Sequence, residues 1–324
     1  MSPLVRLLVS LAISFPLLLL NVVFIIWFER KTLADIYGGI GPKHHGPFGL
    51  FQLAFDGMKL IAKEDVIPAK ADKMLFIIAP FLVFVPAFMT FAAIPVYNNI
   101  YARNFDIGIF YIFGATTLIP VGIILAGWAS FNKYSLLGGL RSAAQQISYE
   151  VPLLMATLGA VMLSGSLSLV EIVKAQSKVW FIVLQPFAFI FFFIVMLAEL
   201  NRAPFDMPQA ESELVAGYNV EYTGMRFAFF MFGEYAMLLV MSALVTILFL
   251  GGWNSPIPAL NGLVPGITWF VLKTYLIVFI IIWIRGTFPR LRVDQLMHFS
   301  WKVLLPLNLA NLLITSAILT VVYL

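Results

Sequence analysis

The chain has no cysteine and only three histidines among its 324 residues. Without cysteine it forms no disulfide, holds no thiolate-bound iron–sulfur cluster and uses no cysteine nucleophile. His44 and His45 are adjacent, so their side chains point in different directions, and neither a haem nor a metal site is predicted. Redox centres are therefore expected in partner proteins, and the chemistry of this chain is expected from carboxylates and arginines.

Charge is also scarce, since 11% of the residues are charged and 61% are hydrophobic. Soluble domains have about a quarter of their residues charged. The apolar runs have the length of about 20 residues that a membrane helix needs, rather than the short alternating pattern of a β-barrel. We predict an all-α integral membrane protein with a single helical membrane domain over residues 1–324, whose N-terminus is a span and not a removed signal peptide.

About eight transmembrane helices are expected. They are placed at about Val5–Phe28, Met74–Val96, Ile107–Ala129, Ile147–Leu163, Val179–Leu200, Phe227–Leu250, Ile267–Ile284 and Trp301–Val322. Most of the 20 basic residues fall in the loops that follow the odd-numbered spans. The positive-inside rule then predicts that loops 29–73, 130–146, 199–226 and 285–300 are cytoplasmic and that both termini lie on the outer side.

Within the first of these loops, Leu50–Glu64 has the pattern of an amphipathic helix. Leu53, Met58 and other apolar residues share one face, whereas Asp56 and the lysines share the other. Such a helix is too polar to span a bilayer and is suited to its surface. Packing beneath a partner subunit is the alternative, and the two are compatible.

Acidic residues concentrate where the fifth span meets the sixth. Six of the chain's 16 acids lie there, namely Glu199, Asp206, Glu211, Glu213, Glu221 and Glu234. Ionisable groups at membrane depth are costly and indicate an ion or substrate path. Glu150, Glu199 and Glu234 lie at span boundaries, and as desolvated neighbours they predict a proton path; the alternative is that each is a boundary acid in water.

Arginines accompany these acids. Arg30, Arg202, Arg226 and Arg285 lie on the same predicted side, where they orient the chain and contact lipid headgroups. Alternatively, some pair with the acids or hydrogen-bond the polar headgroup of a lipid-like substrate. Arg202 is the best candidate for such a pair because it is three residues after Glu199 and four before Asp206.

Three segments of the sequence resemble a known family. They read WFERKTLADIYGGIGPKHHGPFGLFQLAFDGMKLIAKEDVIPAKADK, AELNRAPFDMPQAESELVAGYNVEYTGMRFAFF and WIRGTFPRLRVDQLMHFSWKVLLPLNLA. Together they resemble, at the family's spacing over the whole chain, the NuoH family, the membrane heel subunit of respiratory complex I. The resemblance implies a subunit of a proton-translocating quinone oxidoreductase that forms the quinone chamber and links quinone reduction to proton movement through buried carboxylates.

The resemblance also implies the cofactors and partners. The chain itself binds none, quinone or an analogous lipid-soluble carrier is the substrate, and flavin and iron–sulfur clusters belong to partner subunits. Other membrane and peripheral-arm subunits and the bilayer are the expected partners, with no nucleic acid. The expected location is an energy-transducing membrane, the bacterial or archaeal plasma membrane, with the chamber opening to lipid between spans one and six and the surface helix.

Roles carry over residue by residue. Glu150, Glu199 and Glu234 match the proton path. The positions that match the quinone chamber and the coupling loop are Glu29, Arg30, Arg202, Asp206, Glu211, Glu213, Glu221 and Arg285. Gln209 stands where the family usually has a glutamate, and GGIGPKHHGP differs from the commoner RPGPNRVGP, which indicates a divergent relative.

Two other functions are considered. The equivalent subunit of a ferredoxin-, deazaflavin- or hydrogenase-linked relative would keep the fold and change the donor or acceptor; the GYNVEY segment and the complete surface helix favour quinone. A stand-alone solute carrier would show an internal repeat and a midplane site. Here the acids cluster at one face instead.

Overall fold

A computed structural model describes residues 3–97, 105–208, 211–256 and 264–323, with side chains from residue 12 onward except those of 211–212 and 322–323. Within these ranges the fold is helical, without β-strands. The helices are α1 (Pro3–Ile36), α2 (Gln52–Ala62), α3 (Lys73–Ala93), α4 (Gly108–Thr116), α5 (Leu118–Ala129), α6 (Lys133–Ser164), α7 (Leu169–Ala175), α8 (Phe181–Leu184), α9 (Pro186–Glu199), α10 (Glu211–Leu214), α11 (Gly224–Leu248), α12 (Gly266–Thr287), α13 (Val293–Phe299) and α14 (Leu305–Tyr323). The fold class is as predicted.

Seven helical segments among the described residues are long and apolar enough to cross a membrane. They are Ala12–Ile36, Lys73–Ala93, Gly108–Ala129, Lys133–Ser164, Gly224–Leu248, Gly266–Thr287 and Val293–Val321. The remaining predicted span, Val179–Leu200, is divided into α8 and the 14-residue α9. The prediction of one continuous helix there is wrong. Pro186 begins α9, and a proline disfavours helical geometry in the residue before it, which is Gln185.

The predicted loop 130–146 is also wrong, because α6 begins at Lys133 and runs for 32 residues. The Asn132 side chain caps it by accepting the backbone N–H of Tyr134. Gly138 and Gly139 lie inside this helix, where they allow close packing. A Cβ atom at Gly138 would collide with the backbone at Gly217. Similarly, the predicted loop 285–300 is mostly helical, since α12 extends to Thr287 and α13 begins at Val293.

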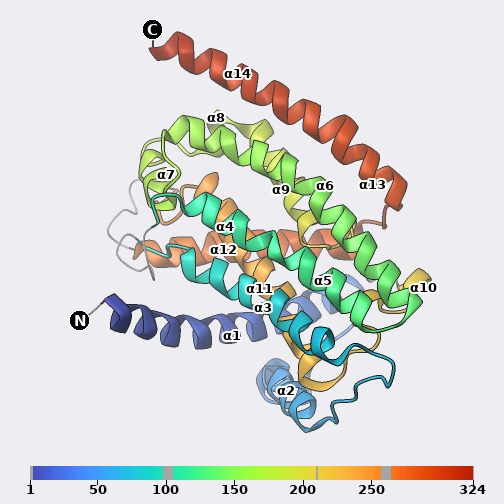
Figure 1. The fold of residues 1–324 in the computed structure, drawn as a ribbon. Coiled ribbons are helices and arrows are strands. Elements are labelled where there is room, and N and C mark those ends of the chain that lie inside the picture. Colours follow the sequence, from blue (N-terminus) through green and yellow to red (C-terminus); the bar gives the residue numbers. More distant parts are fainter. Residues whose placement is uncertain (1–2, 98–104, 209–210, 257–263, 324) are drawn as a thin grey trace.

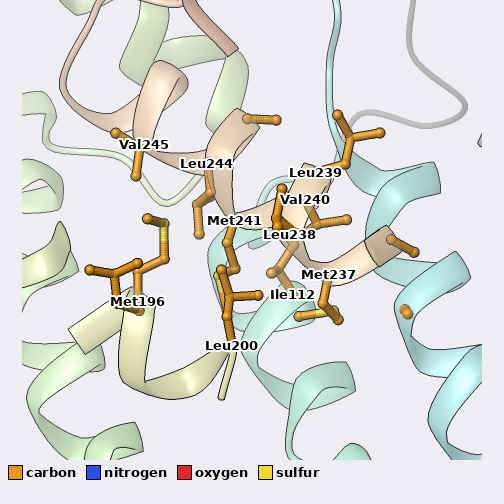
Figure 2. Close-up of a cluster of buried hydrophobic side chains, with 14 of the residues drawn as sticks. Ile112, Met196, Leu200, Met237, Leu238, Leu239, Val240, Met241, Leu244 and Val245 are labelled. Carbon is orange, nitrogen blue, oxygen red and sulfur yellow. The ribbon is translucent and has the colours of Figure 1, made fainter. Parts of the chain in front are cut away.

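Helix α11 forms the centre of the bundle. Its sequence is apolar around most of its circumference, and such helices are buried on all sides. It packs against α1, α3, α9 and α12. Figure 2 shows Met241 and its neighbours on α11 in one buried cluster with Met196 from α9, Leu200 just after α9 and Ile112 from α4. This helix therefore holds Glu234, near its middle, at a fixed place relative to the other helices.

The helices bring the charged segments to one end of the bundle. In Figure 1 the first turn of α1 and the last turn of α14 lie on the left, whereas α10 and α13 lie on the right and α2 lies at the bottom, near the middle of the view. We call the second region the charged end; it contains the C-terminal ends of α1, α9 and α12 and the N-terminal ends of α6 and α11. The predicted surface helix is present as α2, which packs on α1 and α11.

Candidate functional site

A buried ion cluster joins α1, α12 and the loop after α9. Glu29 is 3% exposed and Arg202 is 6% exposed. Arg202 Nη1 donates to both carboxylate oxygens of Glu29, at 3.1 and 3.3 Å, and Arg285 Nη1 donates to the same carboxylate. A buried carboxylate needs such partners because its desolvation is costly. The predicted chamber residues Glu29, Arg202 and Arg285 are thus together, although the pairing of Arg202 with Glu199 or Asp206 does not occur.

The end of α9 explains how Arg202 reaches Glu29. Asn201 has a positive φ of 50°, which reverses the chain after Leu200. The backbone N–H of Asn201 donates to Ala198, and that of Arg202 donates to Leu197. These two bonds are the Schellman arrangement, in which asparagine is an accepted residue at the left-handed position. The Arg202 side chain therefore points back into the bundle instead of toward solvent.

A second cluster surrounds a small cavity of about 30 Å³. Glu199 from the end of α9 and Glu234 from α11 both line it, together with Gln146, Asn201 and Tyr218. The Tyr218 hydroxyl donates to Glu234 Oε1 at 2.7 Å. Glu199 Oε2 is buried and has no hydrogen-bond partner among the described residues. The cavity exceeds the space of roughly 10–15 Å³ that one water needs, and its lining is polar enough to hold one.

Glu150 lies beside this cavity rather than in its lining. It is half-buried on α6, and it is near enough to Glu199 for the two carboxylates to repel each other. Gln146 precedes it by one helical turn and lines the cavity. The three predicted proton-path acids therefore lie in one region around the cavity, with Glu199 at the end of α9 and the other two near the middle of α6 and α11.

Arg202 and Tyr235 connect the two clusters. The guanidinium carbon of Arg202 lies 4.5 Å from the centre of the Tyr235 ring. Burial opposes the charge of Arg202, but the neighbouring Glu29, Tyr235 and Glu234 favour it and raise its pKa above the ordinary arginine value. Because Glu234 also interacts with the Arg285 charge, the ion cluster and the cavity are electrostatically one site.

The other predicted acids make contacts nearer the surface. Asp206 lies 3.5 Å from Arg290, and Glu221 accepts a hydrogen bond of 2.7 Å from Asn132. Glu213 pairs with Arg141 at 2.5 Å, and this hydrogen-bonded cation lowers the pKa of Glu213 below its usual value.

Two further predictions fall at the edge of what is described. The backbone of Glu211 belongs to α10, but its side chain lies outside the described residues, as does Gln209.

Arg30 belongs to a separate contact on the surface helix. Its guanidinium pairs with Asp56 of α2 at 2.7 Å, which ties α2 to α1. The residues Phe51, Phe55, Met58 and Ile61 are exposed on the outer side of α2. The helix therefore presents an apolar stripe away from the bundle. Met58 is on this stripe as predicted, whereas Leu53, which was expected on the same face, is buried.

Sequence reasoning missed several polar residues. Tyr218, Tyr235, Gln146 and Asn201 received no role, although Tyr235 adjoins Glu234 and Gln146 is one helical turn from Glu150. Lys273 was also missed. This buried lysine on α12 donates to the carbonyls of Leu250, Gly252 and Asn254 at 2.6–3.0 Å and lies 4.1 Å from the Trp180 ring centre. It holds the turn after α11 at the end of the bundle opposite the charged end.

The fold and the site together define a polytopic helical membrane protein with buried carboxylates and arginines gathered at one end. The chain belongs to a family whose model is described as NADH dehydrogenase and matches residues 9–316. It is 54% identical to the H subunit of NADH-quinone oxidoreductase from Geobacillus kaustophilus, over 90% of this chain and 87% of that relative. The proteins of the same name from Geobacillus thermodenitrificans and Bacillus mycoides are 52% and 53% identical, over 92% and 90% of this chain and 89% and 87% of the relatives.

Proposed function

We propose that the chain is the membrane subunit of a complex I-type NADH-quinone oxidoreductase and that its buried charges link quinone reduction to proton translocation. The names of its relatives support the class of reaction. The coupling role is supported by an unbroken series of contacts through the site. Arg202 contacts Glu29 and Tyr235, its charge interacts with Glu234, and Glu234 shares a cavity with Glu199.

The chemistry explains why such a site is useful. Reduction of a quinone to a quinol takes two electrons, which partner subunits supply, and two protons. Negative charge develops on the quinone oxygens when electrons arrive before protons. In a low-dielectric site that charge changes the energy of nearby ions strongly. Arg202 and Arg285 are the cations that this charge attracts. When they interact with it, they stabilise the charged forms of Glu29 and Glu234 less, which favours protonation of those carboxylates.

The cavity offers the next step. Tyr218 donates to Glu234, and the polar lining between Glu234 and Glu199 has room for a bridging water. A proton passes from one carboxylate to the other through such a bridge, and Glu150 continues the path along α6. The repulsion between Glu150 and Glu199 disfavours the state in which both carboxylates are charged. The two groups therefore share one proton and titrate as a coupled pair.

The surface contacts suggest how the protein is placed. The charged end is proposed to face the cytoplasm and the peripheral-arm subunits, with both termini on the outer side of the plasma membrane. Glu213 and Glu221 hold their loop to Arg141 and Asn132, which presents a fixed surface to the peripheral arm. The apolar stripe of α2 lies at the membrane surface, where it borders the opening of the quinone chamber.

The test is Glu234→Gln in the assembled complex. This change keeps the size of the side chain and replaces the carboxylate, which binds and releases a proton, with an amide, which does not. We expect quinone-linked NADH oxidation and proton translocation to fall, while NADH oxidation by an artificial acceptor that takes electrons upstream stays near normal. Glu171→Gln is the matched control because Glu171 is an exposed acid paired with Lys174. Equal activity of the two variants with quinone would refute the coupling role of Glu234.

A further inference from the structure

The face of α6 that meets the end of α9 carries buried polar residues. Ser142 precedes Gln145 and Gln146 by three and four positions, so the three side chains share one side of the helix. All three are buried, and Gln145 is 1% exposed. Burying an amide is costly unless it is hydrogen-bonded. Each of the three residues finds a partner in the segment after Leu197, which carries Arg202.

Gln145 makes the shortest of these contacts. Its Nε2 atom donates to the Ala198 carbonyl and to the Phe205 carbonyl, both at 2.7 Å. The Ala198 carbonyl lies where the turn after α9 begins, and it also accepts the Asn201 N–H. Phe205 lies where that turn ends, and its own N–H donates to the Arg202 carbonyl. One amide group therefore joins both ends of the turn in which Arg202 lies.

Other polar contacts to this turn are longer or come from another side of it. Ser142 Oγ and Gln146 Nε2 lie 3.3 and 3.4 Å from their partners in the turn. Both distances are at the upper limit for a hydrogen bond between nitrogen and oxygen. From the α12 side, the Leu291 N–H donates to the Pro204 carbonyl at 3.0 Å. The position of the turn relative to α6 therefore depends mainly on Gln145.

We propose that Gln145 is a positioning residue that keeps Arg202 within hydrogen-bond distance of Glu29, an inference that rests on the function proposed above for Arg202. The backbone bonds inside the turn fix its shape, whereas the two bonds from Gln145 fix its place against α6. The bonds between Arg202 and Glu29 are 3.1 and 3.3 Å long, and such bonds weaken beyond about 3.2 Å. A shift of the turn by roughly 0.5 Å would therefore loosen the pair.

The first test is a structure of the assembled complex with Gln145→Met. Methionine has a similar length and no donor, so it fills the space and loses both hydrogen bonds. We expect Arg202 Nη1 to move beyond about 3.5 Å from both oxygens of the Glu29 carboxylate. Gln176→Met is the matched control. Gln176 is also buried and donates to backbone carbonyls, but it lies beside the turn after α11, so its loss should leave the pair unchanged.

The second test is the rate with quinone. Arg202 is proposed to respond after electrons reach the quinone, so Gln145→Met should lower kcat about tenfold while KM for quinone stays within about twofold. NADH oxidation by an artificial acceptor should be unchanged. Gln176→Met should leave kcat within about twofold of normal, although it lowers the melting temperature of the complex. Adding Gln145→Met to Arg202→Ala should cause no further loss beyond about twofold.

The outcomes separate the positioning role from the proposed function. An intact pair between Arg202 and Glu29 in the Gln145→Met complex would overturn the positioning role. A broken pair with a normal quinone rate would support that role and refute the coupling role of Arg202 instead. Losses that multiply when Gln145→Met and Arg202→Ala are combined would also overturn the proposal, since the two residues would then act separately.

A milder variant covers the case in which Gln145→Met does not assemble. Gln145→Asn keeps the amide but is one methylene too short to reach both carbonyls, so kcat with quinone should fall about threefold. A normal kcat in this variant, with Arg202 unmoved, would overturn the proposal.

Discussion

The pairing of Arg202 with Glu29 yields the sharpest prediction about coupling. Arg202→Ala removes both hydrogen bonds to the Glu29 carboxylate and the contact of the guanidinium with the Tyr235 ring. Glu29 is 3% exposed, so solvent cannot replace the lost partner. Breaking a buried pair costs about 3–5 kcal/mol. Because Arg285 still contacts Glu29, we expect the lower end, about 3 kcal/mol.

The assay compares two electron acceptors in the assembled complex. If this free energy is lost at the step that links quinone chemistry to protonation, about 3 kcal/mol corresponds to a rate roughly a hundredfold slower. NADH oxidation by an artificial acceptor should remain within about twofold of normal, since it bypasses this chain. Arg202→Lys should be intermediate because lysine keeps the charge and loses the two-pronged geometry.

A double-mutant cycle distinguishes a functional pair from two separate residues. Glu29→Ala alone should lower the quinone-linked rate, and adding Arg202→Ala should lower it little further. The coupling energy should then be about 2–3 kcal/mol, in the range found for contacting residues. Additive losses, or equal losses with both acceptors, would refute the reasoning, because the first would show independence and the second would show failed assembly.

Three other outcomes are expected. Tyr218→Phe removes the 2.7 Å hydrogen bond to Glu234, which is worth about 1.5–3 kcal/mol for a charged acceptor. Proton translocation in proteoliposomes should therefore slow roughly tenfold or more, while the rate with an artificial acceptor stays the same. An unchanged rate of translocation would contradict the proton transfer proposed between Glu234 and Glu199. Lys273→Met leaves backbone carbonyls unpaired and should lower the free energy of unfolding by about 2–4 kcal/mol. The complex should then have a lower melting temperature but keep its quinone activity at low temperature. An unchanged melting temperature would contradict the role of Lys273 in holding the turn after α11. Burial alone would raise the pKa of Asp56, but its hydrogen bonds, chiefly that with Arg30, lower it below the usual aspartate value. The stabilisation of α2 by this pair is then complete above the unfolded-state pKa of about 3.9 and is lost only as the pH falls through the lower folded-state value. Hydrogen exchange in residues 52–62 should therefore show no added opening between pH 7 and pH 5, and a rise in that window would refute the assignment.

Much of the fold follows from local sequence. Long apolar runs predict membrane helices because an unpaired backbone group in lipid is costly, and a helix pairs its own backbone. The exceptions have local reasons that only packing reveals. Gly138 and Gly139 resemble loop residues, yet they lie inside α6 because Gly217 and α5 approach there. The break before Pro186, in contrast, was signalled by the proline itself.

The candidate site divides in the same way. The sequence identifies costly acids such as Glu199 and Glu234, because their rarity in an apolar chain is visible without coordinates. It does not identify their partners. Spacing favoured pairing of Arg202 with its sequence neighbours, whereas the structure pairs it with a residue 173 positions away.

The sequence by itself therefore determined the class of protein, the approximate helices and the set of residues whose charge needs an explanation. These properties depend on the transfer of individual side chains and backbone groups between water and lipid, which each segment shows independently. Only the tertiary structure decided that Arg202 neutralises Glu29, that Glu199 and Glu234 share a cavity, and that a side chain of α6 joins the two ends of the turn after α9. Those contacts join segments far apart in the chain, and their energies depend on burial that arises only when the helices pack around α11.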